Sequence, residues 1–481
     1  MADGASVARM EDVPGRIERR GIAFIPEEAR HSRPREMAFV FFGTQMTYGS
    51  IAIGALPVAF GLGWLGAATA ILAGTLIGSL FVALMALMGP LAGTNGTVTS
   101  SAFFGTRGRY VGSFITQIID LGYFAMILWV SAPPLVQAAH RLLGLPAGSG
   151  ALMVALLLVA VLVLTFGIFG HATLVAWEKF VSYASLICLL VLVGFCLPHL
   201  AAAPNPKTNP LVLGSLWPSW MLAVTITMSN AISYAPFAGD YARYIPSRTQ
   251  GRAVFAWPFA GMVAGCLIAC LCGEAIGLAV ADPFDPNTQM LAYLPGLLLL
   301  PVVLIGMIGN AANGGMVVYN GMLDLQAILW WMSRPRVGLI FSAIGLVIAY
   351  LGLIVFKASN SILALCAIVT VLVTPWTVIN VIGYLRHGRR FDTAALQAFA
   401  RPGERGRYWY TGGFNRPAIF AWGASVVVGL MFSDTALFVG PLARRAHGVD
   451  LSFLSAAIVA AILYGLLDRL SVGSRVMGQG L

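Results

Sequence analysis

The chain has 481 residues, of which 58% are hydrophobic and 10% are charged, and its formal net charge is +10. A soluble protein of this length carries about 25% charged residues, so the composition excludes an ordinary soluble enzyme and predicts an all-α integral membrane protein in a lipid bilayer. Basic proteins often bind nucleic acid. Here the positive charge follows the predicted membrane topology, so no nucleic-acid partner is expected.

Runs of roughly 20 apolar residues are long enough to cross a bilayer as helices. Twelve such runs predict twelve transmembrane helices, at approximately 37–60, 64–88, 110–138, 150–169, 174–197, 217–245, 252–280, 294–331, 337–356, 360–385, 418–440 and 451–470. If the polar first 36 residues lie in the cytoplasm, most arginines fall on cytoplasmic segments, as the positive-inside rule requires. The exceptions on the outer side are Arg141, Lys207, Lys357, Arg444 and Arg445.

This topology divides the chain into a cytoplasmic tail at 1–36, a core of ten helices at 37–385, a cytoplasmic loop at 386–417, helices 11 and 12 at 418–470 and a cytoplasmic tail at 471–481. The protein is therefore expected in the plasma membrane as a multi-pass protein with both termini inside. No cleavable signal peptide is expected, because the first apolar run is long enough to span.

The first predicted helix is interrupted by glycines and by polar residues near its centre. It contains "FFGTQMTYGSIAIGALP", in which Gly43, Gly49 and Gly54 alternate with a polar segment that includes Gln45. Irregular backbone within a membrane is tolerated where it lines a cavity, and broken helices at matching places in two repeats point to a substrate site.

The sixth predicted helix is interrupted in the same way, five helices later. Its sequence "SYAPFAGDYARYIP" contains Pro236, which cannot donate a backbone hydrogen bond and which disfavours helix at the preceding residue. Residues 236–246 are predicted to form an inner half-helix about 16 Å long. On it, Asp240 and Arg243 are three residues apart and can pair as an inner gate.

Ionisable residues inside membrane helices are costly and therefore need a reason. Asp120 lies near the middle of the third helix, on a stripe with Tyr123, and it is a candidate for binding a flat heterocycle, for carrying a proton, or for a purely structural pair. Glu274 in the seventh helix is a second proton-carrier candidate, although a structural role is favoured there. His171, Glu178 and Lys179, at the inner end of the fifth helix, are expected to lie in a solvated junction between loop and helix.

The eighth helix contains "GNAANGG", with Asn310 and Asn313 three residues apart. Amide side chains offer a donor and an acceptor, which complements the edge of a nucleobase. The alternative is hydrogen bonding between closely packed helices.

No metal site, cofactor or catalytic residue is predicted. The six cysteines lie in apolar runs without the spacing of metal ligands, so they are expected to be buried thiols. "GLGWLG" at 61–66 matches a dinucleotide-binding pattern, but it follows a membrane helix and not a strand, so a tight turn is predicted.

Four segments in order resemble the nucleobase:cation symporters, in particular their purine/cytosine permease branch. They are "IERRGIAFIPEEAR", "FGLGWLG", "AFFGTRG" and "APFAGDYARYIP", and the resemblance covers roughly residues 17–470. It implies a leucine-transporter-like fold of twelve helices, with a 5+5 inverted repeat in which helices 1 and 6 are broken.

The resemblance also implies a substrate site between helices 1, 3, 6 and 8. Carried over by position, the substrate-binding residues are Gln45, Tyr123, Asn230, Ser233, Tyr234, Asn310 and Asn313, with Asp120 as a further candidate. Two positions depart from the expected pattern: Asp120 replaces an apolar residue, and Ile127 replaces a polar one. Both departures change which hydrogen bonds helix 3 can offer.

The resemblance implies a secondary active transporter that imports a nucleobase or related heterocycle, cytosine-like or purine-like, together with a coupling cation. The family's sodium site uses hydroxyl groups of helix 8, and "IGNAANGG" has none. Protons are therefore favoured over sodium, with Asp120 as the first candidate carrier. A symporter of another small solute (an amino acid, allantoin, a hydantoin or a vitamin precursor) and a membrane sensor that does not transport remain alternatives, and the oligomeric state stays open.

Overall fold

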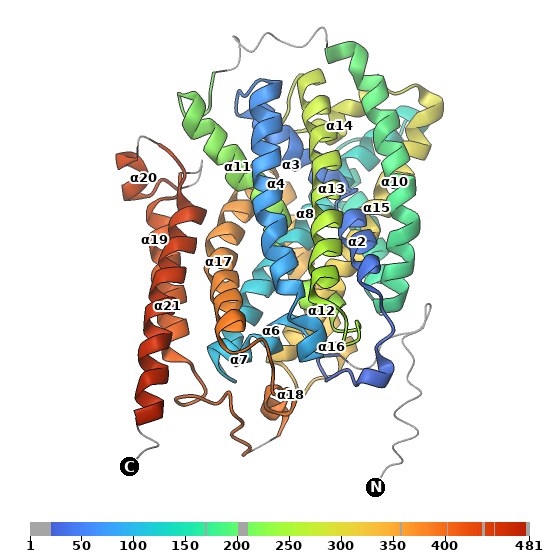
Figure 1. Cartoon of the computed structure of the whole chain (residues 1–481). Coiled ribbons are helices and arrows are strands. Elements are labelled where there is room, and N and C mark those ends of the chain that lie inside the picture. Colours follow the sequence, from blue (N-terminus) through green and yellow to red (C-terminus); the bar gives the residue numbers. More distant parts are fainter. Residues whose placement is uncertain are drawn as a thin grey trace.

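The computed structural model describes residues 21–168, 171–200, 210–355, 358–401, 403–434, 438–446 and 448–477. These residues form an all-helical fold (Figure 1), in which the only extended pairing is two isolated bridges, Thr411 with Phe414 and Asp434 with Val439. The predicted all-α class is confirmed.

Nine helices of the described residues are long and apolar enough to cross a membrane, and a bent pair, if counted as one span, makes a tenth. The long helices are α4 (Trp64–Ala86), α8 (Arg109–Leu143), α9 (Ser149–Ile168), α10 (His171–Leu200), α13 (Gly251–Ala279), α15 (Gly296–Ile328), α16 (Arg334–Tyr350), α17 (Ala358–Arg386) and α21 (Ser452–Met477). A π-helical turn, η3 (Leu351–Val355), extends α16.

The bent pair consists of α2 (Pro34–Gly43) and α3 (Tyr48–Ala59), whose axes differ by 63°. Two further shorter helices, α11 (Leu216–Ile232) and α19 (Arg416–Met431), also fall on predicted apolar runs. Each of the twelve apolar runs found in the sequence thus overlaps a helix.

The inner half-helix predicted at 236–246 is wrong in length. The α-helix α12 covers only Ala238–Ala242 and is flanked by turns. The amides on either side of Pro236 bond three residues back, as in Ala235 N–H to the carbonyl of Ile232 (2.9 Å) and Phe237 N–H to the carbonyl of Tyr234 (3.2 Å). Because proline cannot donate and disfavours α geometry before it, a tighter winding replaces most of the expected helix.

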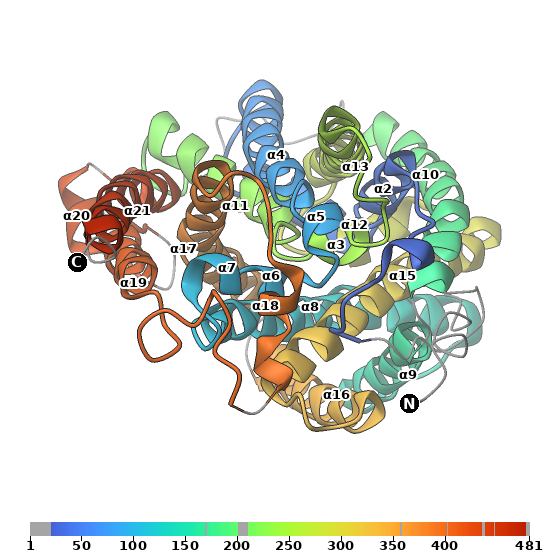
Figure 2. The same cartoon turned by 60° about the horizontal axis from the view of Figure 1, so that its bottom comes forward.

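Short helices connect the long ones, and the sequence did not predict them. They are η1 (Glu27–Ala29), α5 (Gly89–Ala92), α6 (Gly96–Thr99), α7 (Ser101–Phe104), α14 (Pro286–Gln289), η2 (Met290–Tyr293), α18 (Thr393–Leu396), η4 (Ala398–Ala400) and α20 (Pro441–Arg445). Figure 2 shows α5, α6, α7, α12 and α18 together at the lower end of the molecule.

The helix α13 approaches the broken span very closely through a row of glycines. A Cβ atom on Gly261, Gly265 or Gly273 would press against the backbone of α2 or α3, and Gly54 of α3 would press against the backbone of Cys270 in return. Small residues allow such close packing of membrane helices. The row fixes α13 against both helices of the bent pair, so the bend is held from one side.

Replacing Gly54 by alanine is expected to destabilise the fold, because the new methyl group would collide with rigid backbone at Cys270. Overpacking of this kind costs about 1–3 kcal/mol, which lowers the thermal midpoint of the detergent-solubilised protein by several degrees. Gly423→Ala in α19 is the matched control, because no atom lies within 4 Å of its added carbon. Equal midpoints for the two variants would contradict the packing described.

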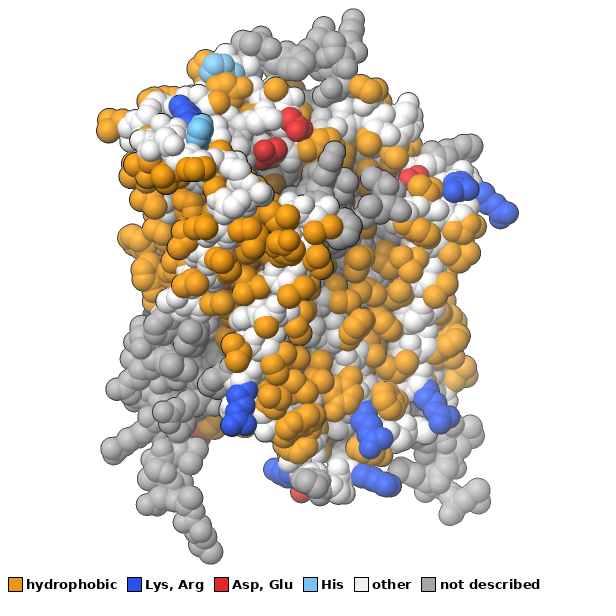
Figure 3. All heavy atoms as spheres, turned by 180° about the vertical axis from the view of Figure 1, so that it is seen from behind, with side chains coloured by type: hydrophobic (Ala, Val, Ile, Leu, Met, Phe, Trp, Pro, Cys, Tyr) orange, Lys and Arg blue, Asp and Glu red, His pale blue; other side chains and the backbone are white. Residues whose placement is uncertain are grey.

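Apolar side chains cover the middle of the face drawn in Figure 3, between two more polar ends. Figure 3 shows hydrophobic side chains over the middle of one face and Lys and Arg side chains along its lower rim. Large apolar side chains with more than half of their surface exposed include Phe180, Leu297, Leu339, Phe420 and Leu470. Exposed apolar surface of this extent is the mark of a lipid-facing protein, so the chain is a multi-pass membrane protein.

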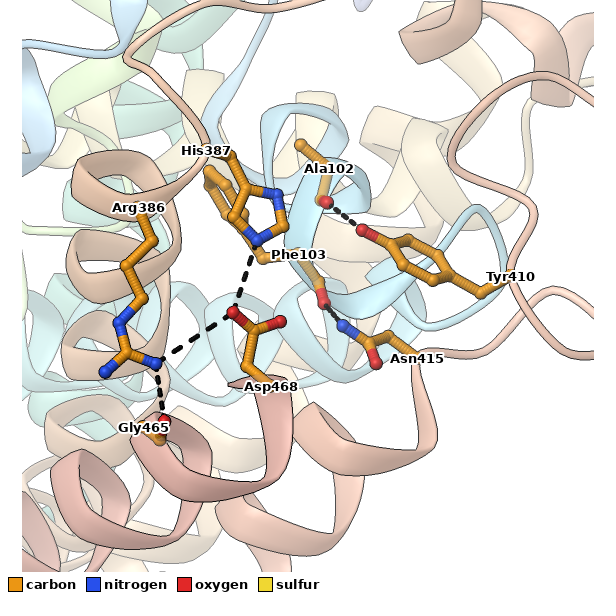
Figure 4. A network of polar contacts seen from close by, with 8 residues as sticks. All are labelled: Ala102, Phe103, Arg386, His387, Tyr410, Asn415, Gly465 and Asp468. Atoms are coloured by element: carbon orange, nitrogen blue, oxygen red, sulfur yellow. Dashed lines mark hydrogen bonds and ion pairs between the residues drawn. The ribbon is translucent and has the colours of Figure 1, made fainter. Parts of the chain in front are cut away.

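The C-terminal helices α19 and α21 lie at one edge of the molecule, next to α17 (Figures 1 and 2). Polar contacts fasten α21 to the lower end of α17 (Figure 4). Arg386 donates to the carbonyl of Gly465 (2.6 Å) and lies 4.0 Å from the carboxylate of Asp468, while His387 lies 3.4 Å from the same carboxylate.

The segment after α17 is held to α7 in the same view. Tyr410 donates its hydroxyl to the carbonyl of Ala102 (2.6 Å), and Asn415 donates to the carbonyl of Phe103 (2.6 Å). These contacts hold the segment against α7, directly before α8 in the chain.

Candidate functional site

The break between α2 and α3 has its backbone groups satisfied by side chains. The hydroxyl of Thr47 caps α3 by accepting from the amide of Ser50 (3.3 Å), and Asn310 of α15 accepts from the amide of Tyr48 (2.9 Å). Asn287 donates to the carbonyl of Tyr48 (3.0 Å). Buried backbone groups need such partners, so the break is built into the fold.

The two interrupted helices are joined by a hydrogen bond between amide side chains. Gln45, in the break after α2, accepts from Nδ2 of Asn230 near the end of α11 (2.8 Å) and from the hydroxyl of Ser50 (3.2 Å). Gln45 is 0% exposed and Asn230 is 3% exposed. Residues 44–47, between α2 and α3, therefore contact the last turn of α11 inside the protein.

A small cavity lies beside this junction. It is bounded by the first break, α8, the end of α11 and α15, and its lining residues are Thr44, Thr47, Gly49, Ser50, Tyr123, Met126, Ile127, Asn230, Tyr234 and Asn313. None of them carries a formal charge. Two tyrosine rings, two amides and three hydroxyl groups can bind a neutral, flat, polar molecule.

Four of the residues predicted from the sequence line this cavity. The hydroxyl of Tyr234 donates to Oδ1 of Asn313 (2.9 Å), and the hydroxyl of Tyr123 lies 3.4 Å from the carbonyl of Ser229. Asn230 forms the junction with Gln45, which lies just behind the lining. Ser233 does not line the cavity, and its hydroxyl donates to the carbonyl of Asn230 (2.9 Å).

Asn310 lies outside the cavity lining. Its Oδ1 accepts from the amide of Tyr48, and its Nδ2 donates to the hydroxyl of Ser131 (2.7 Å). Both ends of the amide are thus occupied in joining α15 to the first break and to α8. The structure brings Asn310 to the site as a support, and its predicted contact with substrate stays a prediction.

The two candidate proton carriers also lie outside the cavity lining. Asp120 of α8 is buried, and in the described part of the chain its Oδ2 has no hydrogen-bond partner. Glu274 of α13 is 3% exposed, and in the described part of the chain its Oε1 has no hydrogen-bond partner.

The predicted inner-gate residues lie in a polar layer below the cavity. Asp240 accepts from the amide of Gly96 in α6 (2.7 Å). Arg243 donates to the carbonyl of Gly21 (2.7 Å) and to the hydroxyl of Tyr319 in α15 (3.0 Å), and its side chain is 0% exposed. Arg243 therefore connects the segment before α2 to α15.

Two functional positions were missed by the sequence analysis. Ser50 bonds Gln45 and lines the cavity, and its position directly after the polar "TQMTYG" was the available signal. Asp324 accepts from Asn95 (3.1 Å) and from Thr97 (2.8 Å) of the α6 region. The sequence feature that could have identified Asp324 is that it is a single acidic residue within an apolar helix. Among the described residues, no group of three His, Cys, Asp or Glu side chains could hold a metal ion.

Comparison with known proteins identifies the class to which this fold and site belong. The family described as "Permease for cytosine/purines, uracil, thiamine, allantoin" matches residues 24–454. The chain belongs to this family, and it is a membrane transporter and not an enzyme. The resemblance to the purine/cytosine permease branch is confirmed.

Among its relatives, the putative purine-cytosine permease YxlA of Bacillus subtilis is 27% identical over 471 residues, which cover 94% of this chain and 96% of the Bacillus protein. The purine-cytosine permease FCY2 of Saccharomyces cerevisiae is 24% identical over 281 residues, which cover 58% of this chain and 50% of the yeast protein.

Two solved structures of Mhp1, a nucleobase-cation-symport-1 family transporter, share the fold. A closed conformation with bromovinylhydantoin bound has a TM-score of 0.76 at 16% identity, covering 94% of this chain and 96% of Mhp1. An inward-facing conformation has a TM-score of 0.72 at 18% identity, covering 96% of both chains.

Proposed function

We propose that the protein is a secondary active transporter that imports a nucleobase or a related heterocycle, cytosine-like or purine-like, by proton symport. The observation that carries the proposal is the uncharged cavity between the two interrupted helices, lined by Tyr123, Tyr234, Asn230 and Asn313. The names of the Bacillus and yeast relatives, both purine-cytosine permeases, support the same substrate class.

The lining matches the chemistry of a flat heterocycle. Tyrosine rings stack on planar ligands, and an amide presents a donor and an acceptor side by side, as the edge of a base does. The Oδ1 of Asn313 already accepts a hydrogen bond from the hydroxyl of Tyr234, so its NH2 group is the part that can donate to a ligand. An amino acid would require partners for two charges, and the lining offers none.

A hydantoin or allantoin is the second candidate substrate. The structure of Mhp1 with bromovinylhydantoin bound favours it, because such rings are also flat and carry several amide groups. The same lining could bind either class, so the uptake experiment must include both.

The helix contacts support the predicted 5+5 inverted repeat and twelve spans. If α2–α3, α4, α8 and α9 are helices 1 to 4, then α11–α12, α13, α15 and α16 are helices 6 to 9. Helix 1 then contacts helix 7 (α3 with α13) as helix 6 contacts helix 2 (α11 with α4). In the same way, helix 3 contacts helix 9 (α8 with α16) as helix 8 contacts helix 4 (α15 with α9). With α10, α17, α19 and α21, twelve spans result, and both termini lie on the cytoplasmic side.

Transport is proposed to proceed by alternating access. Substrate and proton enter the cavity from outside, the outer side closes, and the inner layer with Asp240 and Arg243 then opens as one group of helices moves against the other. Protons are favoured over sodium, because residues 305–315 of α15 contain no hydroxyl side chain. The sequence candidates for the proton carrier are Asp120 and Glu274.

Uptake of labelled substrates into cells that lack their own permeases tests the proposal. Cytosine, adenine or a hydantoin is expected to accumulate to a higher level than in cells that carry an empty vector. The accumulation should be greater at acidic external pH, because protons drive entry. Replacing external sodium by potassium is expected to have no effect, and excess amino acids are expected not to compete. If no heterocycle is taken up, the substrate class is wrong.

A further inference from the structure

A buried carboxylate outside the cavity lies next to the first break and has no hydrogen-bond partner in the described part of the chain. Glu178 of α10 is 1% exposed, and neither of its carboxylate oxygens has a hydrogen-bond partner among the described residues. The solvated junction expected here from the sequence is therefore wrong, because the neighbouring helix covers this face of α10. Buried polar atoms almost always have partners, so Glu178 requires an explanation.

Glu178 is in direct contact with the end of the inner half of the broken span. A Cβ atom on Gly43, the last residue of α2, would collide with Oε2 of Glu178 and with the hydroxyl of Ser182, one turn further along α10. Gly43 directly precedes the break at 44–47. The carboxylate thus contacts the end of α2 directly beside the break.

Several charged and titratable groups on the helices packed around Glu178 have other partners, although Oε1 of Glu274 on α13 and Oδ2 of Asp324 on α15 have none among the described residues. On α10 itself, Lys179 points to Glu36 of α2, with its Nζ 3.1 Å from the carboxylate. On α13, Cys266 and Cys270 lie near Nδ2 of Asn230, at 3.8 and 4.0 Å.

The remaining neighbours of α10 follow the same pattern. On α15, the hydroxyl of Tyr319 accepts from Arg243, and Asp324 accepts from Asn95 and Thr97. On η2, Tyr293 donates to the carbonyl of Ala279 (2.7 Å). Tyr234 itself donates to Asn313. Within the described structure, no cation is thus placed to neutralise Glu178.

We propose that Glu178 is the group that binds the coupling proton, and that its protonation holds α2 closed against α10. This inference rests on the proposed proton symport and names the residue that performs it. A proton from the outer side binds a carboxylate oxygen of Glu178 as an O–H group, and the neutral side chain is then tolerated in the apolar contact with α2. Loss of that proton would leave an unpaired charge, which is strongly disfavoured away from water.

Ionisation of Glu178 therefore favours movement of α2 away from α10, so that water can reach the carboxylate. That movement opens the inner side of the first break, and the proton leaves to cytoplasmic water. Since Gly43 lies beside both Glu178 and the break, proton release and opening of the substrate cavity occur through the same displacement.

The two carboxylates favoured from the sequence are less well placed for this role. Asp120 lies among two other acidic residues, Asp240 and Asp324, and away from the cavity lining. Glu274 lies on the stretch of α13 between Gly273 and Gly277, which face Ile51 and Ala55 of α3. That places it against the outer half of the broken span, which is farther from the inner opening.

The test compares carboxylate variants by uptake at several external pH values. Glu178→Gln is neutral at every pH, so its uptake rate is expected not to change with external pH. Its accumulation of substrate is expected to fall by about tenfold for each unit of pH gradient. Exchange of labelled for unlabelled substrate is expected to continue. Glu178→Asp keeps a titratable group, so its pH dependence should remain with a shifted midpoint. Asp120→Asn and Glu274→Gln, which neutralise the other two candidates, should keep the pH dependence.

The outcomes of this test separate the possibilities. A flat profile for Glu178→Gln with exchange retained supports the proposal. A wild-type profile in Glu178→Gln overturns it, and so does a flat profile in Asp120→Asn alone. If Glu178→Gln does not fold, an unshifted midpoint in Glu178→Asp overturns the proposal and a shifted one supports it. Absence of any uptake by the wild-type protein would instead contradict the proposed function.

Discussion

Replacing Asn313 by alanine is expected to weaken substrate binding by about ten- to hundredfold, which is the loss caused by removing a buried hydrogen-bonding group from a ligand site. Asn313 lines the cavity from α15, and its Oδ1 accepts from the hydroxyl of Tyr234. The substitution removes the amide donor and also leaves the Tyr234 hydroxyl without this acceptor. The measurement is equilibrium binding of labelled cytosine, adenine or hydantoin to the purified protein.

A matched control pair lies seven residues further along the same two segments of the chain. The hydroxyl of Tyr241 donates to Oδ1 of Asn320 (3.1 Å), seven residues beyond the Tyr234–Asn313 pair on both sides. Asn320→Ala removes an equivalent buried bond and should cost similar thermal stability, but it lies outside the cavity lining and should keep the affinity. Equal affinity losses in the two variants would show that stability, and not ligand contact, explains the effect of Asn313→Ala.

Much of the fold followed from patterns that act within one helix. Apolar runs located helices correctly from α2 to α21, because lipid imposes a minimum apolar length on each span. Pro236 and the glycines around Gly43 marked the two interruptions, because both residue types disturb α geometry locally. The short helices α5 to α7 could not be predicted, since they depend on contacts such as that of Gly96 with Asp240.

The site was predictable where chemistry and position agreed, as in Tyr123, Asn230, Tyr234 and Asn313, which come together in one cavity. Glu178 escaped prediction for a physical reason. It stands next to Lys179 at the end of an apolar run, a pattern typical of a solvated helix end. Only the packing of α2 over α10 buries the carboxylate while Lys179 points to Glu36.

The positions of these residues suggest how binding and opening are coupled. Gln45 and Asn230 join the two interrupted helices at the cavity, and Glu178 contacts the same broken span from the other side. A substrate in the cavity and a proton on Glu178 therefore act on one element. Coupling requires that each ligand increase the affinity for the other by the same factor, which a shared broken span can provide.

Replacing Arg243 by alanine is expected to open the inner side of the protein while leaving substrate binding possible. Arg243 joins Gly21, before α2, to Tyr319 of α15, and each hydrogen bond from a charged group contributes about 1.5–3 kcal/mol. Losing both should shift the ratio of inner-open to inner-closed molecules by about a hundredfold or more. The inner end would then leak, so concentrative uptake falls while equilibrium binding remains.

Hydrogen exchange of the purified protein measures this opening directly. The amides of Ile25 and Ser32 bond the carbonyls of Gly93 (2.8 Å) and Tyr244 (3.0 Å), so residues 21–33 should lose protection in Arg243→Ala. Arg401→Ala is the control, because Arg401 forms an exposed pair with Glu404 that contributes little, and it should change neither protection nor uptake. If Arg243→Ala abolished binding while residues 21–33 stayed protected, Arg243 would be a ligand-binding residue, and the assignment of this layer to inner closure would be wrong.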